Sequence, residues 1–167
     1  TGSGKTESFM IPILNELIRE REQGELNPGV RALLLYPMNA LANDQMKRLR
    51  SLLENESDIT FGIYTGETEN YEENASEKFF RMHGKRPLPN EIISRDRMKE
   101  APPHILLTNY AMLEYLMLRP EDSVFFEGEY SNSWKFIVID EAHTYTGAKG
   151  IEMSMLLARL KNTIGLS

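Results

Sequence analysis

The chain has 167 residues, a formal net charge of -6 and no cysteine. This length is enough for one domain with a full core, and the 41% hydrophobic and 26% charged fractions are those of a globular protein. The lack of cysteine excludes a disulfide framework and a thiolate metal site, and the acidic balance argues against a wholly basic nucleic-acid binder. Because no apolar run reaches the roughly 20 residues that span a bilayer and no signal peptide opens the chain, we expect a cytoplasmic protein without a membrane partner.

The first part of the chain alternates helical and strand-like patterns. Apolar side chains recur at helical spacing over 6–22, and Pro12 inside this pattern predicts a kink or a tight first segment. The continuous apolar run over 31–36, stopped by Pro37, is typical of a strand buried on both faces of a parallel sheet. The predicted elements of this part are a helix over 6–22, a strand over 31–36, a helix over 39–53 and a strand over 59–64.

The segment 67–99 has a different composition from the rest of the chain. It carries five glutamates and neither lysine nor arginine over 67–77, and it then turns mostly basic over 78–99. We interpret it as an insertion of loop and short helices. Its charged runs are most simply a solvated face, and contact between the basic half and nucleic acid is the alternative.

The second part of the chain continues the alternation. We predict a strand over 104–108, a helix over 109–118, a loop over 121–133, a strand over 134–139 and a helix over 150–162. This order favours an α/β fold with a mainly parallel sheet, right-handed crossovers and helices on both faces. Ligands of such folds bind beyond the carboxyl ends of the strands, so we expect the functional residues at that edge.

The sequence TGSGKT at residues 1–6 is most of a phosphate-binding loop of the pattern G-x-x-x-x-G-K-[ST]. Its glycines let successive backbone N–H groups point inward, and the following helix adds its positive end. Lys5 would bind the β- and γ-phosphates, and Thr6 would offer a hydroxyl to magnesium. A glycine-rich turn with a chance lysine is the alternative. The predicted phosphate contacts are Gly2, Ser3, Gly4, Lys5 and Thr6.

The sequence DEAH at residues 140–143 follows the apolar strand 136–139 and places two carboxylates at its tip. Asp140 would hold magnesium, and Glu141 would orient and deprotonate the attacking water. The alternative is a surface Asp-Glu pair at a strand end. For His143 we expect a role in coupling the nucleotide site to other motifs rather than in proton transfer.

Together these motifs resemble those of the first RecA-like domain of superfamily 2 DEAD/DEAH-box helicases. Residues 1–6 resemble motif I, 36–45 motif Ia, 106–113 motif Ib and 140–143 motif II, while 64–68 falls where the family has a Thr-Gly element. The amino-acid sequences of the middle motifs are most similar to those of the bacterial and archaeal branch related to YprA/MrfA-like helicases. The resemblance covers nearly the whole chain and implies a RecA-like P-loop NTPase domain over 1–167, truncated at both ends, with 67–99 as an insertion.

The resemblance also implies a function: an ATP-dependent helicase or translocase that uses ATP and Mg²⁺ and binds one nucleic-acid strand, with DNA favoured over RNA. The family's motif III and second RecA-like domain are absent, so we expect a second domain in a longer chain. A nucleotide-dependent clamp that does not unwind duplex is the alternative, while the intact Lys5, Thr6, Asp140 and Glu141 argue against a non-hydrolysing scaffold. The implied strand contacts are Pro37, Asn39, Thr65, Gly66, Thr108 and Asn109, of which Asn39 and Asn109 also suit helix caps.

Overall fold

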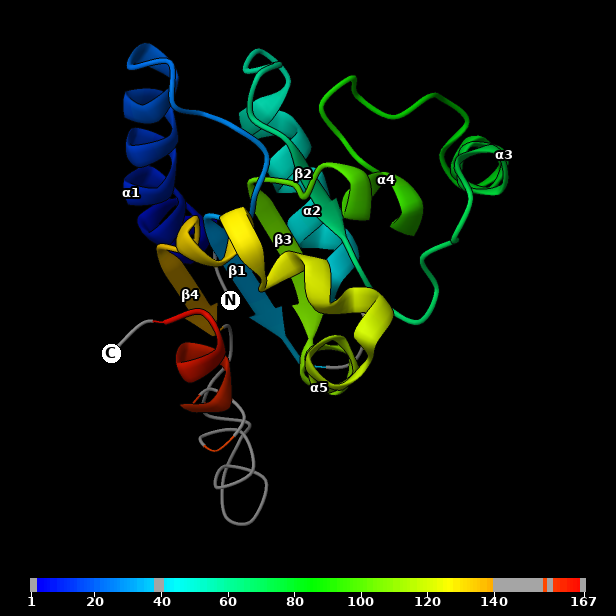
Figure 1. The fold of residues 1–167 in the computed structure, drawn as a ribbon. Helices are drawn as coiled ribbons and strands as arrows, with labels where there is room; N and C mark the ends of the chain where they lie inside the picture. Colours follow the sequence, from blue (N-terminus) through cyan, green and yellow to red (C-terminus); the bar gives the residue numbers. More distant parts are fainter. Residues whose placement is uncertain (1–2, 38–40, 140–154, 156–157, 166–167) are drawn as a thin grey trace.

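The computed structural model describes residues 3–37, 41–139, 155 and 158–165. Within these residues, four strands form one parallel sheet in the order β2-β3-β1-β4 (Figure 1). The strands are β1 (Ala32–Tyr36), β2 (Phe61–Ile63), β3 (Ile105–Asn109) and β4 (Phe136–Ile139). The helices are α1 (Ser3–Glu22), α2 (Leu41–Leu53), α3 (Glu72–His83), α4 (Arg95–Glu100) and α5 (Tyr110–Leu118), with 3₁₀ helices η1 (Pro120–Phe125) and η2 (Gly128–Asn132). The predicted parallel α/β fold is confirmed.

Alternate side chains of the central strand β1 serve two separate cores, because successive residues of a strand point to opposite faces. On one face Ala32, Leu34 and Tyr36 pack with apolar residues of α1 and α2. On the other face Leu33 and Leu35 pack with residues of α5 and η1. All five residues of β1 are buried, which explains the continuous apolar run that predicted the strand.

Several predicted boundaries change in the structure. α1 begins at Ser3 and continues through the exposed Pro12, while Ile13 and Leu17 after the proline are buried against the sheet. β2 is shorter than predicted, and the predicted loop over 121–133 is wrong, because η1 and η2 occupy most of it. Apolar side chains such as Phe125 hold these tight turns to the core.

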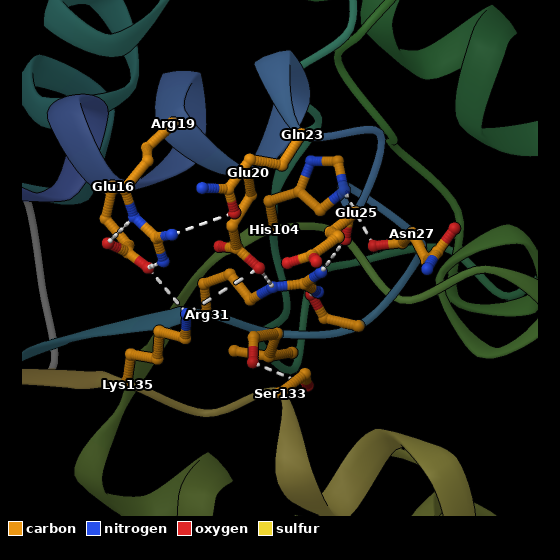
Figure 2. A network of polar contacts seen from close by, with 12 residues as sticks. Glu16, Arg19, Glu20, Gln23, Glu25, Asn27, Arg31, His104, Ser133 and Lys135 are labelled. Atoms are coloured by element: carbon orange, nitrogen blue, oxygen red, sulfur yellow. Dashed lines mark hydrogen bonds and ion pairs between the residues drawn. The ribbon is translucent and has the colours of Figure 1, made fainter.

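A polar network fixes the amino-terminal edge of the sheet (Figure 2). Arg31, just before β1, donates from Nε to Glu20 Oε1 of α1 at 3.1 Å and from Nη1 to the Gly29 carbonyl at 2.7 Å. Both side chains of this ion pair are buried. Lys135, which directly precedes β4, pairs with Glu16 of α1. The network therefore holds the second half of α1 against the edge where the strands start.

His104, which precedes β3, belongs to the same edge (Figure 2). Its Nδ1 accepts a hydrogen bond from the Thr60 N–H at 3.0 Å, so Nε2 carries the proton and donates to the Asn27 carbonyl at 3.1 Å. Burial, and secondarily the charge of Arg31, lowers the pKa of His104 to about 4. The neutral ring thus joins three chain segments at the start of the sheet.

The length of α1 places its first turn at the opposite edge. A helix of 20 residues is about 30 Å long, whereas a five-residue strand is about 17 Å long. Since the end of α1 lies at the amino-terminal edge, its beginning reaches the edge where the parallel strands end. Within the described residues, none of the helices combines the length and the apolar surface that a bilayer crossing requires.

Candidate nucleotide and strand-binding edge

The start of α1 supplies the backbone of the predicted phosphate loop. Ser3, Gly4, Lys5 and Thr6 form its first turn, and the first four N–H groups of a helix have no partner within the helix. Such a turn favours a phosphate through both these donors and the helix dipole. Of the other predicted site residues, five lie outside the described residues: Gly2, Asn39, Asp140, Glu141 and His143.

The donor chemistry of the predicted metal ligands fits magnesium. β4, which directly precedes Asp140 in the sequence, pairs with β1 in parallel and ends at Ile139, at the carboxyl edge of the sheet. The Thr6 hydroxyl and the Asp140 carboxylate are oxygen donors, which Mg²⁺ prefers, and it usually takes the rest of its ligands from phosphates and water. Among the residues that the structure describes, no group of three or more His, Asp or Glu could hold a metal ion.

A cavity of about 510 Å³ lies at the carboxyl edge of the sheet, and we call it the carboxyl-edge groove. It gathers five of the predicted strand contacts, which come from the ends of three strands and the loops after them: Pro37, Thr65, Gly66, Thr108 and Asn109. Its other wall is α3, from the segment 67–99. The structure thus brings together residues that are up to 72 positions apart in sequence, from Pro37 to Asn109.

The Thr65–Gly66 turn is closed by its own side chains. The Thr65 N–H donates to Thr68 Oγ1 at 2.9 Å, and that hydroxyl donates to the Ile63 carbonyl at 2.9 Å. A Cβ added at Gly66 would meet nothing within 4 Å, so open space lies above this residue. The turn therefore presents backbone to a ligand without a side chain in the way.

Tyr64, directly before this turn, is anchored by a buried carboxylate that the sequence did not single out. Its hydroxyl donates to Asp122 Oδ1 at 2.7 Å. Asp122 also pairs with Arg119 at 2.6 Å and with Lys99 at 3.2 Å, and its side chain is 0% exposed. Burial would raise the pKa of Asp122, but the hydrogen bonds from these three groups outweigh it and lower the pKa. Burial and the bond to Asp122 raise the pKa of Tyr64.

Arg95 of α4 holds the same turn from the other side. Its guanidinium lies 4.8 Å from the centroid of the Tyr64 ring and donates from Nη2 to the Thr65 carbonyl at 2.7 Å. The segment 67–99 therefore does more than present a solvated face, because one of its cations fixes a predicted strand-contacting loop.

The two predicted strand contacts that belong to β3 have defined local roles. Asn109 caps α5, since its Oδ1 accepts from the Met112 N–H at 2.8 Å, and the helix-cap prediction is confirmed for this residue. Thr108 is 2% exposed, and its hydroxyl donates to the Tyr64 carbonyl at 2.7 Å. Its side chain thus ties β3 to the loop after β2.

The sequence did not single out Asp122 or Arg95, and it indicated Tyr64 only as the first residue of the Thr-Gly element. Asp122 lies in a segment that had no helical or strand periodicity, and an acidic residue there looks like any surface residue. Arg95 belongs to a run of cations in which only the fold separates internal partners from exposed charges. Tyr64 offered the one usable signal, because a tyrosine at the end of an apolar strand usually finds a hydrogen-bond partner when buried.

Comparison with known proteins agrees with this geometry. The family model for the DEAD/DEAH box helicase matches residues 1–167. The chain is 30% identical to the Druantia protein DruE of Escherichia coli, over 96% of this chain and 13% of that protein. It is 30% identical to the ATP-dependent helicase Lhr-Core of Methanothermobacter thermautotrophicus, over 99% of this chain and 17% of that protein. No solved structure gives a significant match.

A third relative comes from the branch that the middle motifs indicated. The chain is 31% identical to the uncharacterized ATP-dependent helicase YprA of Bacillus subtilis, over 96% of this chain and 17% of that protein. The chain therefore spans less than a fifth of the length of these relatives. The match along its entire length, together with the parallel sheet and the phosphate-loop helix, shows that the chain belongs to the DEAD/DEAH box helicase family.

Proposed function

We propose that this chain is the first ATP-binding motor domain of a longer helicase or translocase that moves along a nucleic-acid strand. One observation carries the proposal. The start of α1, the end of β4 and five of the predicted strand contacts all belong to one edge of the sheet. A nucleotide site and a strand site on the same rim can be coupled by short movements of the connecting loops.

The proposed chemistry is hydrolysis of ATP by in-line attack of water on the γ-phosphate. Lys5 and the amides of the first turn of α1 bind the phosphates. Glu141 orients the water and accepts its proton, and His143 couples the site to neighbouring motifs. Thr6 and Asp140 would hold Mg²⁺, which would supply positive charge to neutralise the phosphates.

The strand is proposed to lie over the Thr65–Gly66 turn and the start of α5. Short residues and backbone amides there suit phosphate contacts, which position a strand without reading its bases. DNA is our first choice, from the resemblance to the YprA-like branch. A second RecA-like domain, supplied by the same longer chain, would complete the ATP pocket.

Two substitutions in the full-length protein test the ATP site. Lys5→Ala should abolish ATP turnover by weakening phosphate binding. Glu141→Gln should still bind ATP, measured with a fluorescent analogue, yet lose at least about 100-fold in turnover, because general base catalysis contributes roughly 10²–10⁴-fold. Lys161→Ala, at an exposed lysine near the end of the chain, is the control and should keep the unsubstituted rate.

Unchanged turnover in Lys5→Ala would refute the phosphate-loop assignment. Unchanged turnover in Glu141→Gln would leave the loop in place but remove Glu141 as the base.

A further inference from the structure

The Thr65–Gly66 turn presents an unpaired backbone donor to the carboxyl-edge groove. Both residues line the groove, and the space above Gly66 is open. The Gly66 N–H forms no hydrogen bond with any residue that the structure describes. The neighbouring N–H groups all donate within the turn, those of Thr65, Glu67 and Thr68. The direction of the Gly66 donor therefore depends on how firmly the turn itself is held.

Tyr64, directly before the turn, is fixed at each of its polar atoms. Its N–H donates to the Leu107 carbonyl at 2.8 Å, and its carbonyl accepts from the Thr108 hydroxyl at 2.7 Å. Its hydroxyl donates to Asp122 Oδ1 at 2.7 Å. The residue is buried, with the Phe125 ring edge-to-face at a centroid distance of 5.7 Å. The Tyr64 side chain is thus a rigid link between Asp122 and the backbone that enters the turn.

The Asp122 carboxylate joins this tyrosine to two cations from other segments. Its Oδ1 also accepts from Lys99 Nζ of α4, at 3.2 Å. Its Oδ2 accepts from Arg119, the residue after α5, through Nε at 2.7 Å and Nη2 at 2.6 Å. Because the Asp122 side chain is fully buried, one carboxylate below the surface connects the end of β2 with α4 and α5.

Through Arg119 the same network reaches the other proposed strand contact, the start of α5. Arg119 is the C-cap of this helix, and its N–H donates to the Tyr115 carbonyl at 2.9 Å. Asn109 is the N-cap at the opposite end. A helix of nine residues is a rigid rod about 13 Å long. Asp122 therefore holds both elements that are proposed to contact the strand, and it sets the separation between them.

We propose that Asp122 is a positioning residue for strand binding: it fixes Tyr64 and Arg119, and through them the Thr65–Gly66 turn and the start of α5. This inference rests on the proposed function and adds to it a residue that does not touch the strand. A buried ion pair is weak evidence for stability, but this one fixes the directions of three donors from three segments. A strand binds only the fraction of molecules in which both contacts are in place, so loosening the network lowers the apparent affinity in proportion.

Strand affinity of the full-length protein tests this role, with a labelled oligothymidylate titrated at one salt concentration. Tyr64→Phe removes only the hydroxyl, and we expect the Kd for the strand to rise about fivefold, the effect of one hydrogen bond. Asp122→Asn keeps the shape of the side chain but has one acceptor oxygen for donors on two sides, so the Kd should rise about tenfold. The affinity for a fluorescent ATP analogue without a strand should change in neither variant.

The double variant Tyr64→Phe, Asp122→Asn shows whether the effect passes through the tyrosine. Its Kd should rise about tenfold, as in Asp122→Asn alone, because the bond to the hydroxyl is already lost there. Independent effects would multiply to about fiftyfold, and that result would overturn the proposed route through Tyr64.

Glu20→Gln is the matched control, since Glu20 is a buried carboxylate paired with Arg31 at the opposite edge of the sheet. Amide hydrogen exchange locates the loosened segment in each variant. Asp122→Asn should speed exchange at the Thr65 and Thr68 N–H groups, whereas Glu20→Gln should speed it at the start of β1. Only Asp122→Asn should weaken binding of the strand.

The failures can be told apart. A full-length protein that binds neither oligothymidylate nor oligouridylate contradicts the proposed function and this inference together. A protein that binds a strand, while Tyr64→Phe and Asp122→Asn keep the unsubstituted Kd, overturns the inference alone. Equal weakening in Glu20→Gln also overturns it, because the effect would then be a general loss of stability. If Asp122→Asn does not fold, Tyr64→Phe against Glu20→Gln decides by the same comparison.

Discussion

Two buried titratable residues perform opposite electrostatic tasks at the two edges of the sheet. Asp122 stays charged, because Tyr64, Arg119 and Lys99 all donate to it. His104 stays neutral, because its Nδ1 must accept from a backbone N–H and its environment disfavours a proton there. Asp122 anchors the loop beside the carboxyl-edge groove, and His104 joins loops at the amino-terminal edge of the sheet.

His104 makes the stability of the domain depend on pH. Its pKa is about 4 in the fold against an ordinary value of 6.5, so its contribution to stability is fully present above pH 6.5 and is lost as the pH falls toward 4. Between pH 7 and pH 5 the loss should be about 2 kcal/mol, because only the unfolded chain takes up a proton over most of this range. Urea unfolding at the two pH values measures it.

The control for this prediction is His104→Asn, which keeps a hydrogen-bond acceptor near the Nδ1 position. This variant should be less stable at pH 7, but its stability should no longer show the part of the pH dependence that comes from His104. Equal losses between pH 7 and pH 5 in both proteins would show that His104 is not the group responsible. Glu16, whose pKa is lowered to about 2 by hydrogen bonds from Arg19 and Lys135, titrates below this range and does not interfere.

At the scale of elements, the segment 67–99 is attached to the sheet through β2. The Phe61 N–H donates to the Asn90 carbonyl at 3.0 Å, and the Ile92 N–H donates to the Phe61 carbonyl at 2.8 Å. Residues 90–92 thus extend the sheet beyond its edge strand. Asn90 strengthens the junction, since its side-chain amide donates to three carbonyls at the end of α2 and the loop after it.

Gly62 allows this close approach of backbone to backbone. A Cβ there would lie 2.6 Å from the Ile92 carbonyl oxygen and 2.9 Å from Met98 Cε. We expect Gly62→Ala to lower the free energy of unfolding by about 2 kcal/mol, since overpacking of this kind typically costs 1–3 kcal/mol. Gly66→Ala, which has open space at its Cβ position, is the matched control and should have little effect. A loss in Gly66→Ala as large as that in Gly62→Ala, measured by urea unfolding, would contradict this interpretation.

The same elements show how far the sequence predicts this fold. The buried strands β1 and β3 could be predicted because both faces of each strand are covered. Such a strand needs apolar residues at successive positions, which gives a continuous apolar run in the sequence. The position of Thr65, Gly66 and Asn109 at one edge of the sheet could be predicted because each lies at the end of a strand and the strands are parallel. The partners of Arg95 and Asp122 could not be predicted, because each contact joins residues brought together only when α4 and η1 pack beside β2. The two 3₁₀ helices gave no periodic signal over their short lengths.

At the scale of the whole molecule, the sheet separates an edge closed by structural contacts from the edge to which we assign the proposed function. Buried polar pairs such as Arg31–Glu20 close the edge where the strands begin (Figure 2). The opposite edge carries the first turn of α1 and the groove with its α3 wall. This division suits a motor domain, because the rigid edge holds the helices while loops on the other edge respond to ligands.

The proposed function requires that the nucleotide and the strand occupy this one edge and act on each other. It is tested most directly by the steady-state rate of ATP hydrolysis of the full-length protein, with and without single-stranded DNA or RNA. We expect a strand, with DNA the stronger, to raise the rate several-fold, and Lys5→Ala to remove both the basal and the stimulated rate. A rate that neither strand changes, or a stimulated rate that survives Lys5→Ala, would contradict it.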